Sequence, residues 1–368
     1  MIALRRACTA SSRSLRHVLA MLLLAGTAVA GDAMATTYRI VLLQLPVAQG
    51  IYAYGLDINS AGEVVGRYSD SEGPGGTIRE YAVKWSPPDY VMQILPSSED
   101  GVVAREATRI NDVGDIIGNA YLPFQPLYGS VMWKSGGPPI PLATIDQLSY
   151  EANDVNVSGV AVGRITGTEG LVAVWTDPLT VSELSTPSAD ATGYAVNDSG
   201  MIVGDARFSY RLHGFSRTPA GVVKDLGDLP GGKDYSTATD VNNSGQIVGY
   251  SESNVGIRAV LWDADGSMHD LGNFPSNPRQ INAYHADRIN NLGQVIGSAW
   301  HNNTYLAYWL WTPGAGMKPI SRLIDPNDPL HDGTFPYVYG LNDAGVLVGR
   351  ITRSGDPVSR PAIFVPQP

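Results

Sequence analysis

Two carboxylates and an imidazole occupy the same place in a repeated sequence pattern. Glu106, Glu151 and His285 each stand five residues before the Asn of an Asn-x-x-Gly-x-x-x-Gly core. In three copies of this core an arginine stands eight residues after the Asn, and these are Arg67, Arg164 and Arg350. Carboxyl and imidazole groups transfer protons in acid–base catalysis, and a guanidinium holds an anionic group. The set could act on an acidic sugar, although a ring of polar residues at a channel mouth is more often solvated surface.

Aromatic and histidine side chains in the variable loops form a second candidate set, because the repeat pattern gives them no place in a strand core. They are Tyr121, Tyr128, Tyr210, His213, Trp300, His301 and Tyr305. Aromatic rings at these places could stack on a sugar or a peptide. Alternatively, the long loops could pack the rings into small clusters of their own.

The residue patterns do not point to a metal ion, a cofactor or a catalytic nucleophile. The histidines lack the close spacing of zinc ligands, and the loops lack a bidentate carboxylate at a fixed calcium-site position. The only cysteine, Cys8, lies in a segment that we predict to be removed. We therefore expect no metal site, no cofactor, no disulfide and no thiol chemistry.

The elements that must position these residues are seven copies of the Asn-x-x-Gly-x-x-x-Gly core. Their asparagines, separated by 41 to 52 residues, are Asn59, Asn111, Asn156, Asn197, Asn242, Asn290 and Asn342. This spacing is typical of one four-stranded blade. The sequence thus predicts an all-β fold, a seven-bladed β-propeller that residues 36–368 form as a single domain.

Each core predicts a tight hairpin. The Asn side chain can cap a type I turn, and the Gly three residues later, Gly245 in the fifth copy, can take the left-handed conformation. A third strand then carries a shared tryptophan position, which we expect to fill the core between neighbouring sheets. The tryptophans at this position are Trp85, Trp133, Trp175, Trp262 and Trp311.

The two ends of the repeat region complement each other. The last copy stops before a fourth strand, whereas an unmatched strand at residues 38–46 precedes the first copy. A closed ring hides both sheet edges, which an open stack would leave exposed. We therefore predict that the N-terminal strand closes the last blade.

Pairing across each hairpin should place the residue four before the Asn opposite the residue eight after it. The first of these is nearly always small, as at Gly55, and the second is always polar. Long side chains such as Arg67 and Arg164 would then fit near the ring axis and could line a polar channel. The structural alternative pairs Arg67 with Asp57 and Arg164 with Asp154 inside their own hairpins.

Residues 1–35 have the composition of a secretory signal peptide. Arginines precede an apolar run at residues 18–25, and small residues follow at two candidate cleavage sites, after Ala30 and after Ala35. We favour Ala35. The mature protein should then be secreted or periplasmic, and no later stretch reaches the roughly 18 consecutive apolar residues of a membrane-spanning helix.

The mature chain is strongly acidic. Removal of residues 1–35 takes away four arginines and one aspartate, which leaves 21 basic and 34 acidic residues and a net charge of −13. Such a surface repels nucleic acid and anionic membranes. We therefore expect no nucleic-acid partner, no membrane partner after signal removal, and a monomer.

The cores, with the pattern D-[IV]-N-x-x-G-x-[IV]-V-G, and the segment DLGDLPGGKDYSTATDVNNSGQIVGYS resemble the HAF-repeat family of bacterial extracellular proteins. The resemblance covers the chain from Tyr38 to Phe364. It implies an exported protein with repeats of propeller length. The family has no agreed activity or catalytic residues, so the resemblance leaves the function open.

Export, an acidic surface and aromatic loops favour a non-enzymatic binding or interaction module outside the cytoplasm, with a glycan or a protein as its ligand. The alternative function is that of a carbohydrate-active lyase or hydrolase with its site at the channel mouth. A purely structural scaffold is a third alternative.

Overall fold

The computed structural model describes residues 37–46, 52–71, 78–98, 101–122, 128–134, 136–145, 148–166, 171–187, 190–274, 281–302 and 304–367. The chain divides into two units, Met1–Ala35 and Thr36–Pro368, and all the described ranges belong to the second unit. The predicted signal peptide lies outside the described residues. Within the described ranges, no helix combines the length and the apolar character needed to cross a membrane.

The described chain is all-β, as predicted. Its regular structure consists of strands and one short 3-10 helix, η1 (Ile320–Arg322). Buried and more exposed residues alternate along strands such as β26 (Thr334–Leu341). This alternation follows from the pleat, which turns successive side chains to opposite faces.

Four sheets each contain four consecutive strands, with each strand hydrogen-bonded to the next. The first two are formed by β2 (Tyr52–Ile58), β3 (Val64–Ser71), β4 (Ile78–Ser86) and β5 (Val91–Ile94), and by β6 (Val103–Ile110), β7 (Ile116–Tyr121), β8 (Tyr128–Trp133) and β9 (Pro139–Pro141). The next two are formed by β10 (Ser149–Val155), β11 (Ala161–Thr166), β12 (Leu171–Asp177) and β13 (Thr180–Glu183), and by β14 (Ala191–Val196), β15 (Ile202–Phe208), β16 (Arg211–Arg217) and β17 (Val223–Asp225).

The later strands form one larger sheet and one mixed sheet. The larger sheet contains β18 (Ser236–Val241), β19 (Ile247–Ser253), β20 (Gly256–Trp262), β21 (Met268–Asp270), β22 (Ala283–Ile289), β23 (Val295–His301), β24 (Thr304–Thr312) and β25 (Gly316–Pro319). A single parallel pair, Ile257 with Ala283, joins its two halves. In the last sheet, β1 (Tyr38–Leu42) lies beside β28 (Asp356–Pro366), followed by β27 (Leu347–Arg353) and β26.

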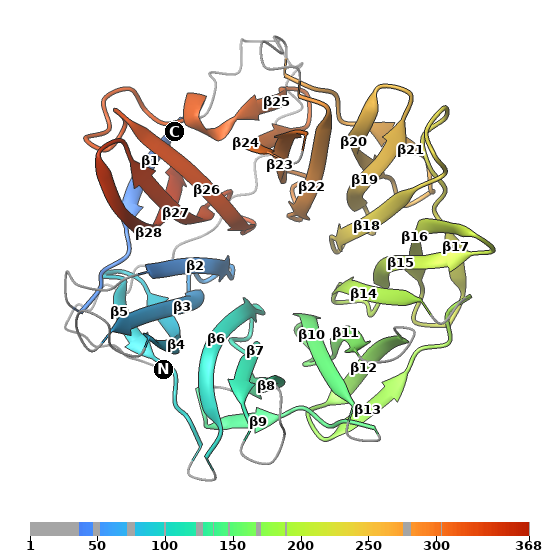
Figure 1. The fold of residues 1–368 in the computed structure, drawn as a ribbon, viewed down its shortest axis with the longest axis horizontal. Coiled ribbons are helices and arrows are strands. Elements are labelled where there is room, and N and C mark those ends of the chain that lie inside the picture. The colour runs from blue at the N-terminus through green and yellow to red at the C-terminus, as the bar shows by residue number, and fades with distance from the viewer. Residues whose placement is uncertain are drawn as a thin grey trace, which may run out of the picture. The chain divides into compact units, whose positions relative to one another are not determined.

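The sheets follow one another around a common axis, with the first strand of each repeat innermost (Figure 1). Hydrophobic side chains fill the space between neighbouring sheets. One such core joins Trp85 of the first repeat to Val348 and Ile363 of the last. The first strand of each repeat therefore lies next to the central region.

Four of the five predicted core tryptophans are fully buried, namely Trp85, Trp133, Trp175 and Trp262. Each of their indole N–H groups donates to a backbone carbonyl, as Trp262 does to Leu226 at 3.0 Å. The prediction for Trp311 is confirmed only in part, because Trp311 is partly buried and packs against the core cluster, whereas Trp309 is the fully buried ring of that sheet. Residues two apart in a strand share a face, so the Trp309 ring takes the core space.

The Asn and Gly residues, which have the same spacing in all seven cores, form the predicted turns. The glycines three residues after each Asn have φ between +73° and +86°, and Gly245 has φ +78°. L-residues with a side chain rarely adopt this conformation. The Asn242 Oδ1 accepts the backbone N–H of Gln246 at 2.9 Å, and the same bond recurs in the other turns.

The asparagine side chains also join one repeat to the next. The Nδ2 of Asn59 donates to the backbone oxygen of Asn111 at 3.2 Å, and each following Asn makes the same bond to its successor. The last bond runs from Asn342 Nδ2 to the backbone oxygen of Asn59 at 3.0 Å. We call this set of seven side chains the asparagine ring, and all of them are buried.

The predicted register is wrong by one residue. Tyr54 rather than Gly55 lies opposite Arg67, and a β-bulge between Gly55 and Asp57 leaves Leu56 unpaired. The same bulge occurs in every repeat. The second Gly of the core makes it possible, since a Cβ on Gly66 would collide with the backbone oxygen of Tyr54.

Candidate functional site

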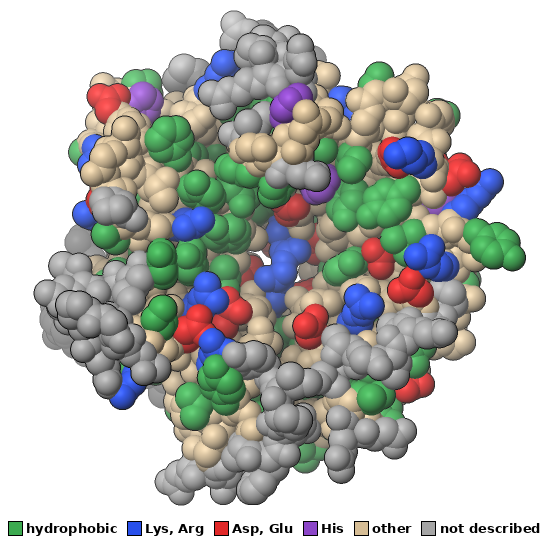
Figure 2. Space-filling model, in the orientation of Figure 1, with side chains coloured by type: hydrophobic (Ala, Val, Ile, Leu, Met, Phe, Trp, Pro, Cys, Tyr) green, Lys and Arg blue, Asp and Glu red, His purple; other side chains and the backbone are tan. Residues whose placement is uncertain are grey.

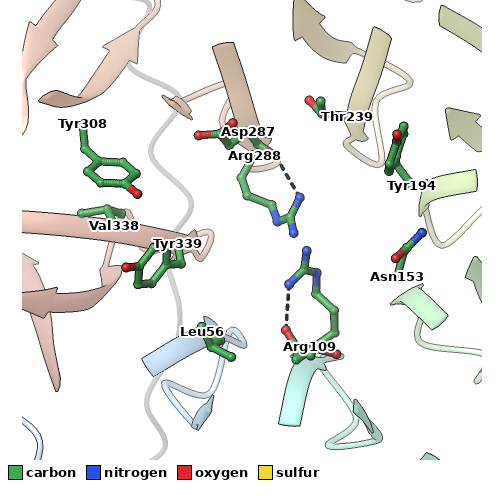
Figure 3. A pocket seen from close by; sticks show the side chains of 11 residues that line it. Leu56, Arg109, Asn153, Tyr194, Thr239, Asp287, Arg288, Tyr308, Val338 and Tyr339 are labelled. Atoms are coloured by element: carbon green, nitrogen blue, oxygen red, sulfur yellow. Dashed lines mark hydrogen bonds between the residues drawn. The ribbon is translucent and has the colours of Figure 1, made fainter. Parts of the chain in front are cut away.

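The bulge residues face the common axis and line a cavity of about 450 Å³. These seven residues are Leu56, Thr108, Asn153, Tyr194, Thr239, Asp287 and Tyr339. Arg109, Arg288, Tyr308 and Val338 complete the lining of this axial cavity (Figure 3). Every repeat therefore contributes at least one side chain to the cavity, and the bulge is what turns that side chain inward.

Two arginines approach each other inside the axial cavity. Arg109 and Arg288 come from the second and sixth repeats, and their guanidinium groups point toward one another (Figure 3). Arg109 Nη1 donates to the carbonyl oxygen of Thr108 at 2.7 Å, and Arg288 Nη1 donates to that of Asp287 at 2.9 Å. Figure 2 shows basic side chains at the centre of the hollow on this face.

Three partly buried aspartates lie next to the bulges, and each joins its own repeat to the next. Asp57, Asp154 and Asp240 each accept the backbone N–H of the following repeat, as Asp240 Oδ2 does from Ile289 at 2.8 Å. Burial raises the pKa of all three carboxyls, to about 6 for Asp154 and about 8 for Asp240. The positive charge of Arg109 opposes the shift of all three groups, and Asp240 still carries only part of its negative charge at pH 7.

A second buried carboxyl network joins the cavity to its mouth. The hydroxyls of Tyr194 and Thr237 both donate to Asp205 Oδ2 at 3.3 Å. Burial raises the pKa of Asp205 to about 6 and that of Asp287 to about 7. Carboxyls with such pKa values can hold or release a proton near neutral pH.

Aromatic rings continue around the mouth of the cavity. His285 stacks on Tyr250 with ring centroids 4.3 Å apart, and Trp300 lies between His285 and Tyr305 at 6.4 Å and 5.6 Å. Tyr305 in turn stacks on Tyr337 at 5.6 Å. Burial lowers the pKa of His285, so its imidazole is neutral at pH 7.

Two arginines extend this row of rings. Arg350 lies 4.3 Å from the ring centroid of Tyr337 and 4.8 Å from that of Tyr54, and Arg67 lies 5.2 Å from Tyr54. These are cation–π distances. We call the whole row the aromatic–arginine arc, which consists of Tyr250, His285, Trp300, Tyr305, Tyr337, Arg350, Tyr54 and Arg67.

The arginine–aspartate ion pairs expected within the hairpins do not form. Arg67 Nη1 lies 3.5 Å from Glu80 and 3.8 Å from Glu106, whereas Asp57 binds the backbone of the next sheet. Asp154 likewise accepts from Val196 rather than pairing with Arg164. The alternative of Arg–Asp pairs is therefore wrong, because the bulge turns each aspartate toward its neighbouring repeat.

The remaining members of the first candidate set lie at equivalent places on the mouth. Glu151 is opposite Arg164 in the register, and Glu106 is opposite Asn119, whose Nδ2 donates to it at 3.5 Å. The charge of Arg164 lowers the pKa of Asp205 against the effect of burial. Arg67, Arg350, Glu106 and His285 are thus brought together along the arc, while Glu151 and Arg164 continue the mouth beyond it.

The second candidate set is divided. Trp300 and Tyr305 belong to the arc. Tyr121, 47% exposed, lies under Arg105 at 4.4 Å, and Arg105 contacts Glu80, the partner of Arg67. The backbone of Tyr128 pairs with that of Tyr121, but its side chain lies outside the described part of the chain.

Three members of the second set have other surroundings. Tyr210 is 96% exposed in the turn between β15 and β16. His213 is 5% exposed, and its Nδ1 lies 2.9 Å from Asp225 Oδ1, which is a structural position. His301 lies at the turn between β23 and β24 with its Nε2 3.1 Å from Asn302.

The axial cavity was missed by reasoning from the sequence, which assumed an unbroken hairpin. The signal that could have found it is the second Gly of each core. An invariant Gly within a strand indicates a bulge or a close backbone approach. If the second Gly of each core is taken as a bulge signal, the residue three before each Asn is predicted to lie at the axis.

Among the described residues there is no group of three or more His, Cys, Asp or Glu side chains arranged to hold a metal ion. The cavity and its mouth instead offer hydroxyls, guanidinium groups, aromatic rings and carboxyls with raised pKa values. This chemistry suits the binding of a polar organic molecule.

No protein-family model matches the chain, and neither does any curated protein. Solved structures do resemble it. A streptogramin B lyase superposes with a TM-score of 0.54 at 9% identity, covering 92% of this chain and 100% of the lyase. The β-propeller domain of the trilobed protease from Pyrococcus furiosus gives 0.51 at 9% identity over 86% of this chain and 94% of that domain.

An acylaminoacyl peptidase from Pyrococcus horikoshii gives a TM-score of 0.51 at 12% identity, over 86% of this chain and 51% of the peptidase. At these identities the likeness shows the fold alone. The chain has a β-propeller fold.

The buried aspartates predict a pH dependence of stability. The folded-state pKa of Asp240 is raised, so its stabilising contribution is complete below about pH 4 and is lost as the pH rises through 8. We expect the melting temperature to fall between pH 4 and pH 8. In Asp240→Asn, which keeps an oxygen for the Ile289 N–H, this fall should be smaller. The exposed Asp265→Asn variant is the control, and an equal slope in all three proteins would contradict the assignment.

Proposed function

We propose that this protein is an extracytoplasmic binding module whose ligand occupies the mouth of the axial cavity. The observation that carries the proposal is the aromatic–arginine arc, in which side chains of adjacent sheets stack in one row beside the opening. Aromatic faces and guanidinium groups bind sugars and peptides by stacking and charge-assisted hydrogen bonds. Rings that served packing alone would lie between the sheets, as Trp85 does.

A groove beside the arc supports the proposal. It has a volume of about 660 Å³ and includes His285 and Trp300 of the arc with Glu252, Asn282 and Asn302. Small-molecule sites have volumes of roughly 300 to 1,000 Å³. The groove and the axial cavity together offer a ligand both apolar faces and hydrogen-bonding groups. A glycan or a protein segment outside the cytoplasm fits this description.

A carbohydrate-active lyase or hydrolase is the second candidate function. Asp205 favours it, because a carboxyl whose pKa burial raises to about 6 could act as a general acid beside Tyr194. One structural neighbour is a streptogramin B lyase, but that likeness bears on the fold alone. We favour binding because the side chains of the arc are stacked on one another, whereas a reacting group must reach the substrate.

We further propose a seven-bladed propeller closed by its N-terminal strand. Support comes from β1, which pairs with β28 from Tyr38 and Pro366 to Leu42 and Ala362. The hydrogen bond from Asn342 to Asn59 gives independent support. Membership of the HAF-repeat family, removal of residues 1–35 and a secreted or periplasmic monomer without nucleic-acid or membrane partners belong to the same proposal, and the sequence pattern supports them.

Removal of residues 38–46 tests closure. The deletion strips β1 from β28 and takes away Gln44, whose backbone oxygen accepts the Trp85 indole N–H at 3.0 Å. We expect aggregation or a large fall in melting temperature, because an exposed edge strand pairs with other chains. A chain that begins at Tyr38 is the control. If the shortened protein melts like this control, the shared blade is wrong.

The binding site is tested by replacing Trp300 and Tyr305 with Ala in one variant. A screen of glycans and peptides first identifies a ligand of the unmodified protein. The double variant should then bind it roughly tenfold more weakly or worse, because each lost stacking contact contributes about 0.5 to 1.5 kcal/mol. Tyr210→Ala, far out on a turn, serves as the control. Unchanged affinity in a folded double variant would remove the arc from consideration, and a screen without any ligand would contradict the binding function.

A further inference from the structure

Arg109 and Arg288 take no part in the arc, although they lie on the same axis. Along the inner strand the mouth residue stands five before the Asn, whereas these arginines stand two before it and therefore lie deeper. In each arginine, one N–H donates a hydrogen bond to the carbonyl oxygen of the preceding residue. A guanidinium has further donors in the same plane, and Figure 3 shows both groups directed into the cavity.

The charge of Arg109 acts on the carboxyls around this pair, but their hydrogen bonds go to other groups. Asp57, Asp154 and Asp240 accept backbone N–H groups of neighbouring repeats, and Asp287 accepts a hydrogen bond from Ser298. Within the described part of the chain, neither guanidinium forms a direct ion pair with a carboxylate. Two like charges that face each other in a recess repel. An anion between them would remove this repulsion and satisfy both sets of donors.

The other polar groups of the cavity limit the choice of anion. Thr108 and Thr239 use their hydroxyl protons on backbone oxygens, the latter at 2.8 Å from Ala286, and Asn153 Nδ2 donates to Gly193 at 2.8 Å. Their oxygen lone pairs therefore remain as acceptors. They require a ligand with O–H donors close to its anionic group.

We propose that the axial cavity binds the carboxylate of an acidic sugar, a uronic acid alone or at the end of a short chain. The carboxylate lies between Arg109 and Arg288, and the sugar hydroxyls donate to Thr108, Thr239 and Asn153. A peptide C-terminus supplies the carboxylate without the neighbouring hydroxyls. This inference rests on the proposed binding function and names its ligand class.

The test is a titration of the folded protein, by calorimetry, with trigalacturonate, its methyl ester and a C-terminal tripeptide acid. We expect trigalacturonate to bind at least tenfold more tightly than the other two. Arg109→Gln and Arg288→Gln should each remove this preference and leave the weak binding of the ester unchanged. Arg109→Lys, which keeps the charge, should retain part of the preference. Arg360→Gln on strand β28, which is not an inner strand, is the control for net charge.

Several results would overturn the inference. Equal binding of the acid and the ester would show that the carboxylate is not recognised. A preference that survives both Gln variants but disappears in Arg350→Gln would place the carboxylate at the mouth, which keeps the binding function and removes the axial site. Tighter binding of the tripeptide acid than of trigalacturonate would show that the cavity binds a peptide C-terminus rather than an acidic sugar. Failure of every sugar and peptide to bind would contradict the proposed function itself.

Discussion

One side-chain amide from each repeat holds the inner turns together. Its oxygen caps the turn of its own hairpin, and its nitrogen binds the next turn, so local structure and assembly depend on the same group. A buried amide that lost either partner would leave a polar group unsatisfied, at a cost of about 1 to 3 kcal/mol. Because the bonds run from Asn59 around to Asn342 and back, the inner strands are held at one height on the axis.

The fixed inner strands make the bulges effective. Each bulge turns one extra side chain to the axis, and the second Gly of the core removes the Cβ that would prevent it. The scaffold residues are nearly constant, whereas the bulge residue ranges from Leu56 to Asp287 and Tyr339. The repeated Asn and Gly residues thus form the scaffold, and the bulge residue, which differs between repeats, determines the polar and apolar groups that line the axial cavity.

The sequence alone predicts the strands and turns of each repeat, but it does not predict which side chains meet at the axis. Periodic Asn and Gly predict the turns, and β-branched and aromatic residues predict the strands, because both depend on contacts within one repeat. The sequence singled out Arg67 and His285 by their spacing and Trp300 as a loop aromatic, but it did not show that these residues share one row. Register across a bulge depends on the neighbouring strand, and only the second Gly of each core signals it. The choice of Trp309 over Trp311 as the fully buried ring depends on the neighbouring sheet.

The central claim, that the asparagine ring fixes the inner strands, is tested most directly by the melting temperature of Asn290→Asp. This change keeps an oxygen for the backbone N–H of Gln294 and removes the donor to the backbone oxygen of Asn342. The account predicts a large fall in melting temperature, whereas Asn254→Asp, at an exposed turn, should leave it unchanged. An Asn290→Asp protein as stable as its parent would contradict the claim.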